Sequence, residues 1–164
     1  MSQPGNVTAS DWVIRPYMAT DEGFVVSSWL TSWSTSEYGQ KWGAKRRANL
    51  AGGWWDEWRP VIMLLLREST VRVLCDAGNE DVIWAWACTG GDAVTHYVEV
   101  KYSFKGELGG DMVRALLGDR LTREQVCSFE QRGLRNARIP YPKLWQLDEG
   151  LTARLFARLI ERAA

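Results

Sequence analysis

Three glycines fall within five residues between a predicted strand and a predicted helix, at Gly106, Gly109 and Gly110. The residues before them alternate as in a strand, and the helix is predicted from apolar residues at helical spacing, Met112, Val113, Leu116 and Leu117. The N–H groups at a helix N-terminus, reached through a loop without bulky Cβ atoms, form an anion site. The pattern therefore suits a phosphate ligand, although a plain tight turn explains the glycines equally well.

Metal chemistry is not predicted from the histidine and cysteine content. The chain has a single histidine, His96, and three cysteines without metal-ligand spacing, Cys75, Cys88 and Cys127. One histidine cannot build a site of several histidines, and an odd number of cysteines does not suggest a disulfide framework. We therefore expect reduced core thiols and a cytoplasmic location.

The strand before the glycines has two chemically different faces. Val94, His96, Val98 and Val100 alternate with Thr95, Tyr97, Glu99 and Lys101. His96 thus falls among valines, which favours a structural role for it over a catalytic one.

Length and charge narrow the class of protein. The 164 residues, 46% of them hydrophobic, are enough for one domain with a substantial core. With 20 basic and 20 acidic residues the formal charge is zero, so the balance does not favour nucleic acid or an anionic membrane as a partner. The longest apolar run, 61–66, is too short to span a bilayer, which predicts a soluble protein.

The periodicity predicts a single α/β (α+β) domain at 11–164 after a loose arm at 1–10. The expected order is β-α-α-β-β-β-α-β-α, with a mixed, mostly antiparallel sheet flanked by helices. Strands are predicted at 11–17, 70–77, 81–89, 93–104 and 124–129. A first helix is predicted after a Thr20 cap, because apolar residues follow it at helical spacing: Phe24, Val25, Trp29, Leu30 and Trp33. A second is predicted at 54–68 with Ile62, Leu65 and Leu66 inward, a third ends near Gly118, and a last one begins after Asp148.

Tryptophans and basic residues are concentrated at 29–58. The segment 34–53 has a basic cluster, and Trp42, Trp54, Trp55 and Trp58 lie within or close to it. Basic residues interleaved with aromatics can bind a partner by stacking. A solvated loop is the simpler interpretation, and we expect Trp29 and Trp33 to be core residues.

The strand, glycine turn and helix resemble the acetyl-CoA-binding segment of the GNAT acetyltransferase superfamily. Its pattern is roughly V-x-V-x-P-x-x-[RQ]-G-x-G-x-[GA]. The resemblance implies that acetyl-CoA contacts the strand and turn residues Val98, Val100, Lys105, Gly106, Glu107, Leu108, Gly109 and Gly110. Two residues depart from the pattern: Tyr102 replaces the proline and Leu108 the central glycine, where a leucine side chain would block the pyrophosphate's approach.

The resemblance extends over about residues 12–130. The opening IRPYMATDEG and the serine-tryptophan helix after it are most similar to small bacteriophage-encoded members. In that fold the fourth and fifth strands splay apart around acetyl-CoA. The chain after residue 130 departs from the family, so either 139–145 supplies a short substitute strand or the C-terminal part is reduced.

The resemblance also implies catalytic roles. GNAT enzymes often take a base from a carboxylate on the fourth strand and an acid from a tyrosine after the fifth, which here suggests Glu99 and Tyr141. An exposed strand residue paired with a cation is the alternative for Glu99, and a packed loop anchor is the alternative for Tyr141.

Two functions remain open from the sequence. The first is an acetyl-CoA-dependent N-acetyltransferase acting on an amine of a protein or small molecule. The alternative is a catalytically degenerate GNAT-like phage protein, a virion component or a host-protein-binding module, with the tryptophan-rich region 29–58 as its partner face.

Overall fold

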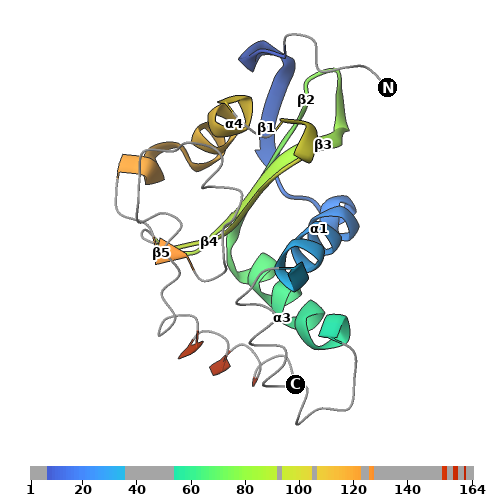
Figure 1. Ribbon diagram of the computed structural model, residues 1–164, viewed down its shortest axis with the longest axis vertical. Coiled ribbons are helices and arrows are strands. Elements are labelled where there is room, and N and C mark those ends of the chain that lie inside the picture. Colours follow the sequence, from blue (N-terminus) through green and yellow to red (C-terminus); the bar gives the residue numbers. More distant parts are fainter. Residues whose placement is uncertain are drawn as a thin grey trace.

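The computed structural model describes residues 7–35, 54–91, 94–104, 107–122 and 126–127, with single residues 153, 154, 157, 158 and 161. Within these ranges the chain is a mixed α+β structure with a sheet and helices on both of its faces (Figure 1). The helices are α1 (Glu22–Thr35), α3 (Trp54–Glu68) and α4 (Glu107–Leu117). The strands are β1 (Trp12–Pro16), β2 (Thr70–Asp76), β3 (Asn79–Thr89), β4 (Val94–Val100) and β5 (Val126–Cys127).

The strands form one sheet in the order β1-β2-β3-β4-β5. The first four are antiparallel neighbours, and β5 lies parallel to β4 through the pairs Val94–Val126 and Thr95–Cys127. A parallel neighbour needs a crossover connection, and α4 is the helix in that connection. The antiparallel strands expected between residues 70 and 104, and the fifth strand beside β4, are therefore confirmed.

A β-bulge interrupts β3 between its pairings with two successive residues of β2. Leu74 pairs with Ala85, whereas Cys75 pairs with Ile83, so Trp84 is an additional residue in β3. A bulge of this kind changes which way the following side chains point. A second shift lies between β3 and β4, where Cys88 faces Tyr97 but Thr89 faces Thr95.

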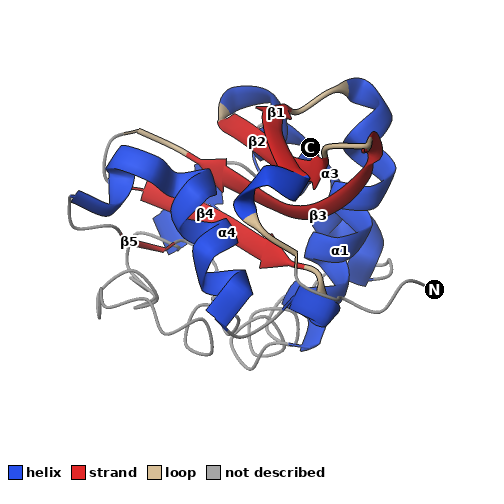
Figure 2. Cartoon of the chain, turned by 90° about the horizontal axis from the view of Figure 1, so that it is seen from above, coloured by secondary structure: helices blue, strands red, loops and turns tan. Residues whose placement is uncertain are grey.

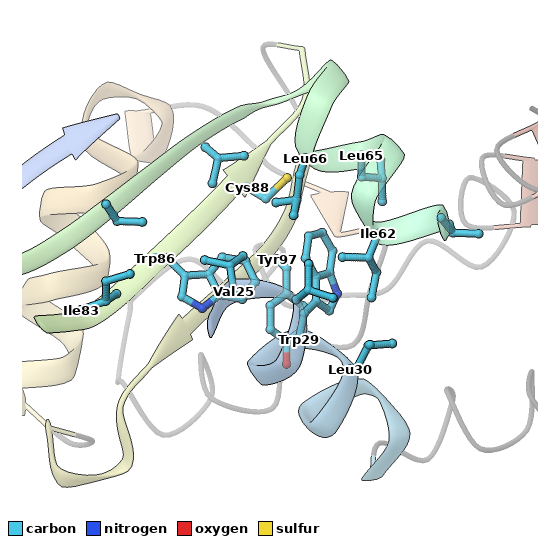
Figure 3. Packing of buried hydrophobic residues seen from close by; sticks show 14 of the residues in the cluster. Val25, Trp29, Leu30, Ile62, Leu65, Leu66, Ile83, Trp86, Cys88 and Tyr97 are labelled. Atoms are coloured by element: carbon cyan, nitrogen blue, oxygen red, sulfur yellow. The ribbon is translucent and has the colours of Figure 1, made fainter. Parts of the chain in front are cut away.

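Helices α1 and α3 pack on one face of the sheet, and α4 covers the other (Figures 1 and 2). The core on the α1 side contains tryptophans and aliphatic side chains from both helices. Trp29, Trp86 and Tyr97 meet there with ring centroids 5.2 to 5.4 Å apart (Figure 3). Such pairs contribute roughly 0.5–1.5 kcal/mol each beyond the burial of their area.

The core on the α4 side is mainly aliphatic. The expected inward residues of α4 are all buried: Met112, Val113, Leu116 and Leu117. They pack against Leu74, Ala85, Val98 and Val100 of the sheet, and at the edge Trp84 and Phe104 have ring centroids 4.9 Å apart. Alternating small and large residues here let the helix lie close to the strands.

Several predicted boundaries are confirmed and others are wrong. The helix at 54–68 has the predicted bounds, and its residues Ile62, Leu65 and Leu66 are buried. Thr20 does not cap α1, because it lies inside a 3₁₀ turn, Ala19–Asp21, that runs directly into the helix. Phe24 is 46% exposed rather than inward, since it lies on the outer side of α1.

The strand predicted at 93–104 ends earlier, at Val100, and Tyr102–Phe104 forms a 3₁₀ turn. The amide of Lys101 still bonds to the carbonyl of Trp84, after which the chain bends towards α4. Cys75 and Cys88 are buried free thiols, as predicted. In the described part of the chain, none of the helices has the length and apolar character needed to cross a membrane.

Candidate functional site

The glycines that suggested a phosphate loop lie partly within a helix. Because α4 begins at Glu107, Leu108, Gly109 and Gly110 belong to its first turn. The expected loop over these residues is therefore wrong, although the N-terminus of a helix is still where backbone N–H groups lack helical partners. Lys105 and Gly106 lie outside the described residues.

Gly109 has a packing reason to be glycine. A Cβ atom built on it would lie 2.6 Å from the carbonyl oxygen of Phe104 and 3.5 Å from Cγ1 of Val100. The first distance is far below van der Waals contact, and its partner is backbone, which cannot turn aside. Gly109 thus permits the close approach of α4 to the turn before it.

Leu108 is half-buried, and its side chain packs against the apolar cluster beneath α4. We expected this side chain to block a phosphate at the helix end. The packing directs it towards the core instead, and the next two residues have no side chain. Leu108 therefore does not by itself cover the end of α4, whereas Gly109 and Gly110 are themselves buried.

The second half of β4 divides its side chains between the two cores. Val98 and Val100 are buried against α4, whereas Tyr97 and Glu99 point to the α1 side. The face assignment made from the alternation holds for these four residues. Nearer the start of β4, the register shift at His96 interrupts the alternation of side chains between the two faces of the sheet.

Glu99 lines a hollow of about 540 Å³ between β4 and the outer side of α1. It is the candidate catalytic residue that the structure places beside a cavity. The remaining described residues of the lining come from α1: Gly23, Phe24, Ser27, Ser28, Thr31 and Ser32. A carboxylate therefore faces a helix surface that carries four hydroxyl groups.

Two of these hydroxyls are anchored to the aromatic cluster. Ser28 Oγ accepts a hydrogen bond from Trp86 Nε1 at 2.9 Å and donates to the Val25 carbonyl at 3.1 Å. The Tyr97 hydroxyl donates to Ser32 Oγ. These hydrogen bonds to buried rings hold Ser28 and Ser32 in place. They thereby fix the side of α1 that lines the hollow relative to Glu99.

An ion pair fixes the start of α1. The Arg15 guanidinium donates to both Asp21 carboxylate oxygens, at 2.7 and 2.9 Å, and the Met18 amide donates to the same carboxylate at 2.8 Å. The Arg15 hydrogen bonds, together with that amide, hold the pKa of Asp21 below its usual range against the opposing effect of burial. This bidentate contact ties β1 to the helix that lines the hollow.

His96 has no place in the hollow. It is 5% exposed, and burial, with a smaller effect from Arg120, lowers its pKa to about 4. At neutral pH it is an uncharged imidazole with Nε2 beside Gly90, where an added Cβ would be 2.7 Å away. This environment agrees with the structural role expected for it.

The hydroxyl groups of the site were not predicted from the sequence. Ser27 and Thr31, like Ser28 and Ser32, are four residues apart, the spacing that puts side chains on one side of a helix. That spacing was visible in the sequence, but its position opposite Glu99 depends on how α1 packs on the sheet. Tyr141, the predicted acid, lies outside the described residues.

The tryptophan-rich region is only partly described. Trp29 and Trp58 are fully buried, so neither side chain contributes to an exposed partner face. The segment 36–53, with its basic cluster, lies outside the described residues. Within the described ranges, no group of three or more histidine, cysteine or acidic residues is placed to hold a metal ion.

Comparison with known proteins finds no matching family model, no matching curated protein and no matching solved structure.

Proposed function

We propose that this protein is a GNAT-like N-acetyltransferase that transfers an acetyl group from acetyl-CoA to an amine, with Glu99 as the general base. The observation that carries the proposal is the position of Glu99 in a hollow beside α1, on the strand that leads into the glycine-bearing α4. One strand thus connects a carboxylate facing a cavity with a helix N-terminus suited to an anion.

One feature of the described residues fits acetyl-CoA. The first turn of α4 contains backbone N–H groups without helical partners, and the Leu108 side chain packs inward. Bound acetyl-CoA would supply the activated thioester, and Val98 to Val100 would lie alongside its pantetheine arm.

Glu99 then acts on the amine. The amine nitrogen forms a bond to the acetyl carbon as the bond from that carbon to sulfur breaks, and the proton lost by the nitrogen passes to the Glu99 carboxylate. The hydroxyls of α1 position the amine, and the anchored Ser28 and Ser32 keep that surface rigid. The thiolate of CoA leaves and takes a proton from an acid, a role proposed for Tyr141.

Calorimetric titration with acetyl-CoA and, separately, with CoA tests the proposal. We expect micromolar affinity, which corresponds to about −8 kcal/mol. Gly110→Trp, in the first turn of α4, should abolish binding if circular dichroism shows that it still folds. No binding to the unmodified protein would overturn the proposal and leave the interaction-module alternative.

Glu99→Gln tests the base. Acetyl-CoA should bind as before, whereas acetyl transfer to amines should fall by about 10²-fold or more, since a general base contributes roughly 10²–10⁴-fold. Glu80→Gln is the control, because this exposed carboxylate lies on β3 and is not among the described residues that line the hollow. Equal activity of Glu99→Gln and Glu80→Gln would remove Glu99 from the mechanism.

A further inference from the structure

The strand β1 lies at the edge of the sheet, and in the described part of the chain it pairs with β2 alone. Its residues Trp12, Val13 and Ile14 are apolar and half-buried. An unpaired strand edge is a template for another strand, so edges are commonly protected by charged side chains or bulges. The stretch 12–14 has no charged side chain, and its pairing with β2 has no bulge. This part of the edge is therefore open to pairing.

The hydrogen bonds to β2 determine which backbone groups of β1 face outward. The Asp11 carbonyl accepts from the amide that follows β2 at 2.8 Å, and the Tyr17 amide donates to a β2 carbonyl at 3.1 Å. Residues that bond to the neighbouring strand alternate along an antiparallel pair, so between these two contacts the odd-numbered residues bond to β2. The N–H and C=O groups of Trp12 and Ile14 therefore point away from β2.

Pro16 limits how the β1 strand of a second copy can add to this edge. If Ile14 paired with Ile14 of the other copy, Trp12 would face Pro16. Pro16 has no N–H, and its carbonyl already accepts from the Arg15 guanidinium at 3.1 Å. If instead Val13 lies on the two-fold axis, Trp12 of each copy faces Ile14 of the other. Every outward N–H of these residues then meets an outward C=O.

The side chains match in the same register. Trp12 and Ile14 contact the core on the α4 side, so pairing covers the exposed part of each against the other. Val13 of each copy meets its counterpart on the α1 side. Asp11 falls opposite Arg15 of the other copy, whereas like charges at facing positions would oppose pairing. The formal charge of the chain is zero, so the copies do not repel one another as whole molecules.

We infer that two copies of this chain associate through β1, antiparallel about a two-fold axis at Val13, so that their sheets join into one continuous sheet. A few paired residues from each copy bury much less than the roughly 1,200–2,000 Å² of a stable complex, so the association is weak and depends on concentration. The inference does not rest on the proposed function, because no described residue that lines the hollow comes from β1.

Sedimentation velocity tests this association. From about 10 µM to about 1 mM, the weight-average mass should rise from the 18.6 kDa of one chain towards twice that value. Ile14→Pro removes an outward N–H, and proline is tolerated on an edge strand where the N–H faces solvent, so this variant should stay at 18.6 kDa. Ile14→Val, the matched control, keeps the N–H at a similar side-chain volume and should associate like the unmodified protein.

Two results of this measurement would overturn the inference. One is an unmodified protein that stays at 18.6 kDa at every concentration. The other is equal association of Ile14→Pro and Ile14→Val, with circular dichroism showing that both variants are folded.

A disulfide trap tests the register even if Ile14→Pro does not fold. Facing residues of a non-hydrogen-bonded antiparallel pair have Cα atoms about 4.5 Å apart, which a disulfide can span. Val13→Cys should therefore form an intermolecular disulfide in mild oxidant, seen on non-reducing gels after remaining thiols are blocked. Val82→Cys is the control, because Val82 lies on β3 and is more exposed than Val13. Cross-linking of Val13→Cys no faster than that of Val82→Cys would contradict the two-fold axis at Val13.

Discussion

Trp84 and Trp86 are two residues apart on one strand, yet they belong to opposite sides of the sheet. Trp86 is fully buried among the aromatic rings on the α1 side, whereas Trp84 is half-buried beside Phe104 on the α4 side. Strict alternation would put both on the same face. The bulge at Trp84 separates them.

The two sides built around these tryptophans have different chemistry. On the α1 side, indole and phenol groups reach hydroxyls that open into the hollow with Glu99. On the α4 side, aliphatic side chains of the sheet pack against α4, and Gly109 of this helix lies close to the backbone of Phe104. The bulge thus lets one strand supply a polar anchor to one side and an apolar edge to the other.

The largest expected effect is the loss of Trp86. Trp86→Ala should destabilise the protein by about 3–5 kcal/mol, because it leaves a large cavity and removes the donor to Ser28. Trp84→Ala, the matched change on the other side, should cost clearly less, since that side chain is partly exposed. Urea denaturation of both variants measures the difference, and equal costs would contradict the contrast between the two sides.

Acid stability should reveal the buried histidine near the start of β4. In the unfolded chain His96 takes up a proton below about pH 6.5, whereas in the folded protein its pKa is about 4. Stability is unaffected at pH 7 and falls as the pH drops from 6.5 towards 4, by at most about 3 kcal/mol.

His96→Gln isolates this effect, because His96 is the single histidine of the chain. The variant should show a flatter dependence of unfolding free energy on pH between 6.5 and 4.5 than the unmodified protein. A parallel slope in both proteins would mean that the histidine is not buried in its neutral form.

Replacing one glycine in α4 and one in α1 by alanine tests the comparison between the two sides. Gly109→Ala should destabilise by about 1–3 kcal/mol, because its Cβ would meet the Phe104 carbonyl, and this clash outweighs the better helix propensity of alanine. Gly23→Ala in α1 meets nothing within 4 Å and should stabilise slightly, by up to about 0.5–1 kcal/mol. Thermal unfolding of the two variants should therefore shift in opposite directions.

The ion pair at the start of α1 should matter in a lower pH range. The pKa of Asp21 is lowered in the folded protein, so its contribution is fully present above the ordinary value of 3.8 and is lost as the pH falls through the folded value. Asp21→Asn should remove this steep loss below pH 3.8. A steep loss that persists in Asp21→Asn would show that other carboxylates cause it.

Much of this architecture follows from local patterns in the sequence. The helix at 54–68 and the inward residues of α4 were predictable because their apolar residues recur at one spacing over several turns. The bulge at Trp84 was not, because a single additional residue leaves no mark on propensity. The exposure of Phe24 was not predictable either, because periodicity identifies the apolar side of a helix but not which residues lie at the border of that side.

The candidate site was less predictable than the fold. Glu99 could be selected as a carboxylate on the expected strand, but the hollow is formed by α1, which is far away in sequence. Position 109 likewise needs a glycine because of the turn at Tyr102–Phe104, a segment that the sequence pattern predicted to be part of a strand. Both features come from tertiary contacts rather than from local preference.

The connection between β3 and β4 depends on a residue made later in the chain. Arg120 donates hydrogen bonds to the carbonyls of Gly90, Gly91 and Val94, the Gly91 contact being 2.7 Å long. During synthesis the two strands can pair as soon as both have emerged, but these carbonyls receive their guanidinium only 29 residues after Gly91. The strands can pair only after β4 ends at Val100, 20 residues before Arg120, so at roughly 5–20 residues per second the paired strands wait about 1–4 s for this guanidinium.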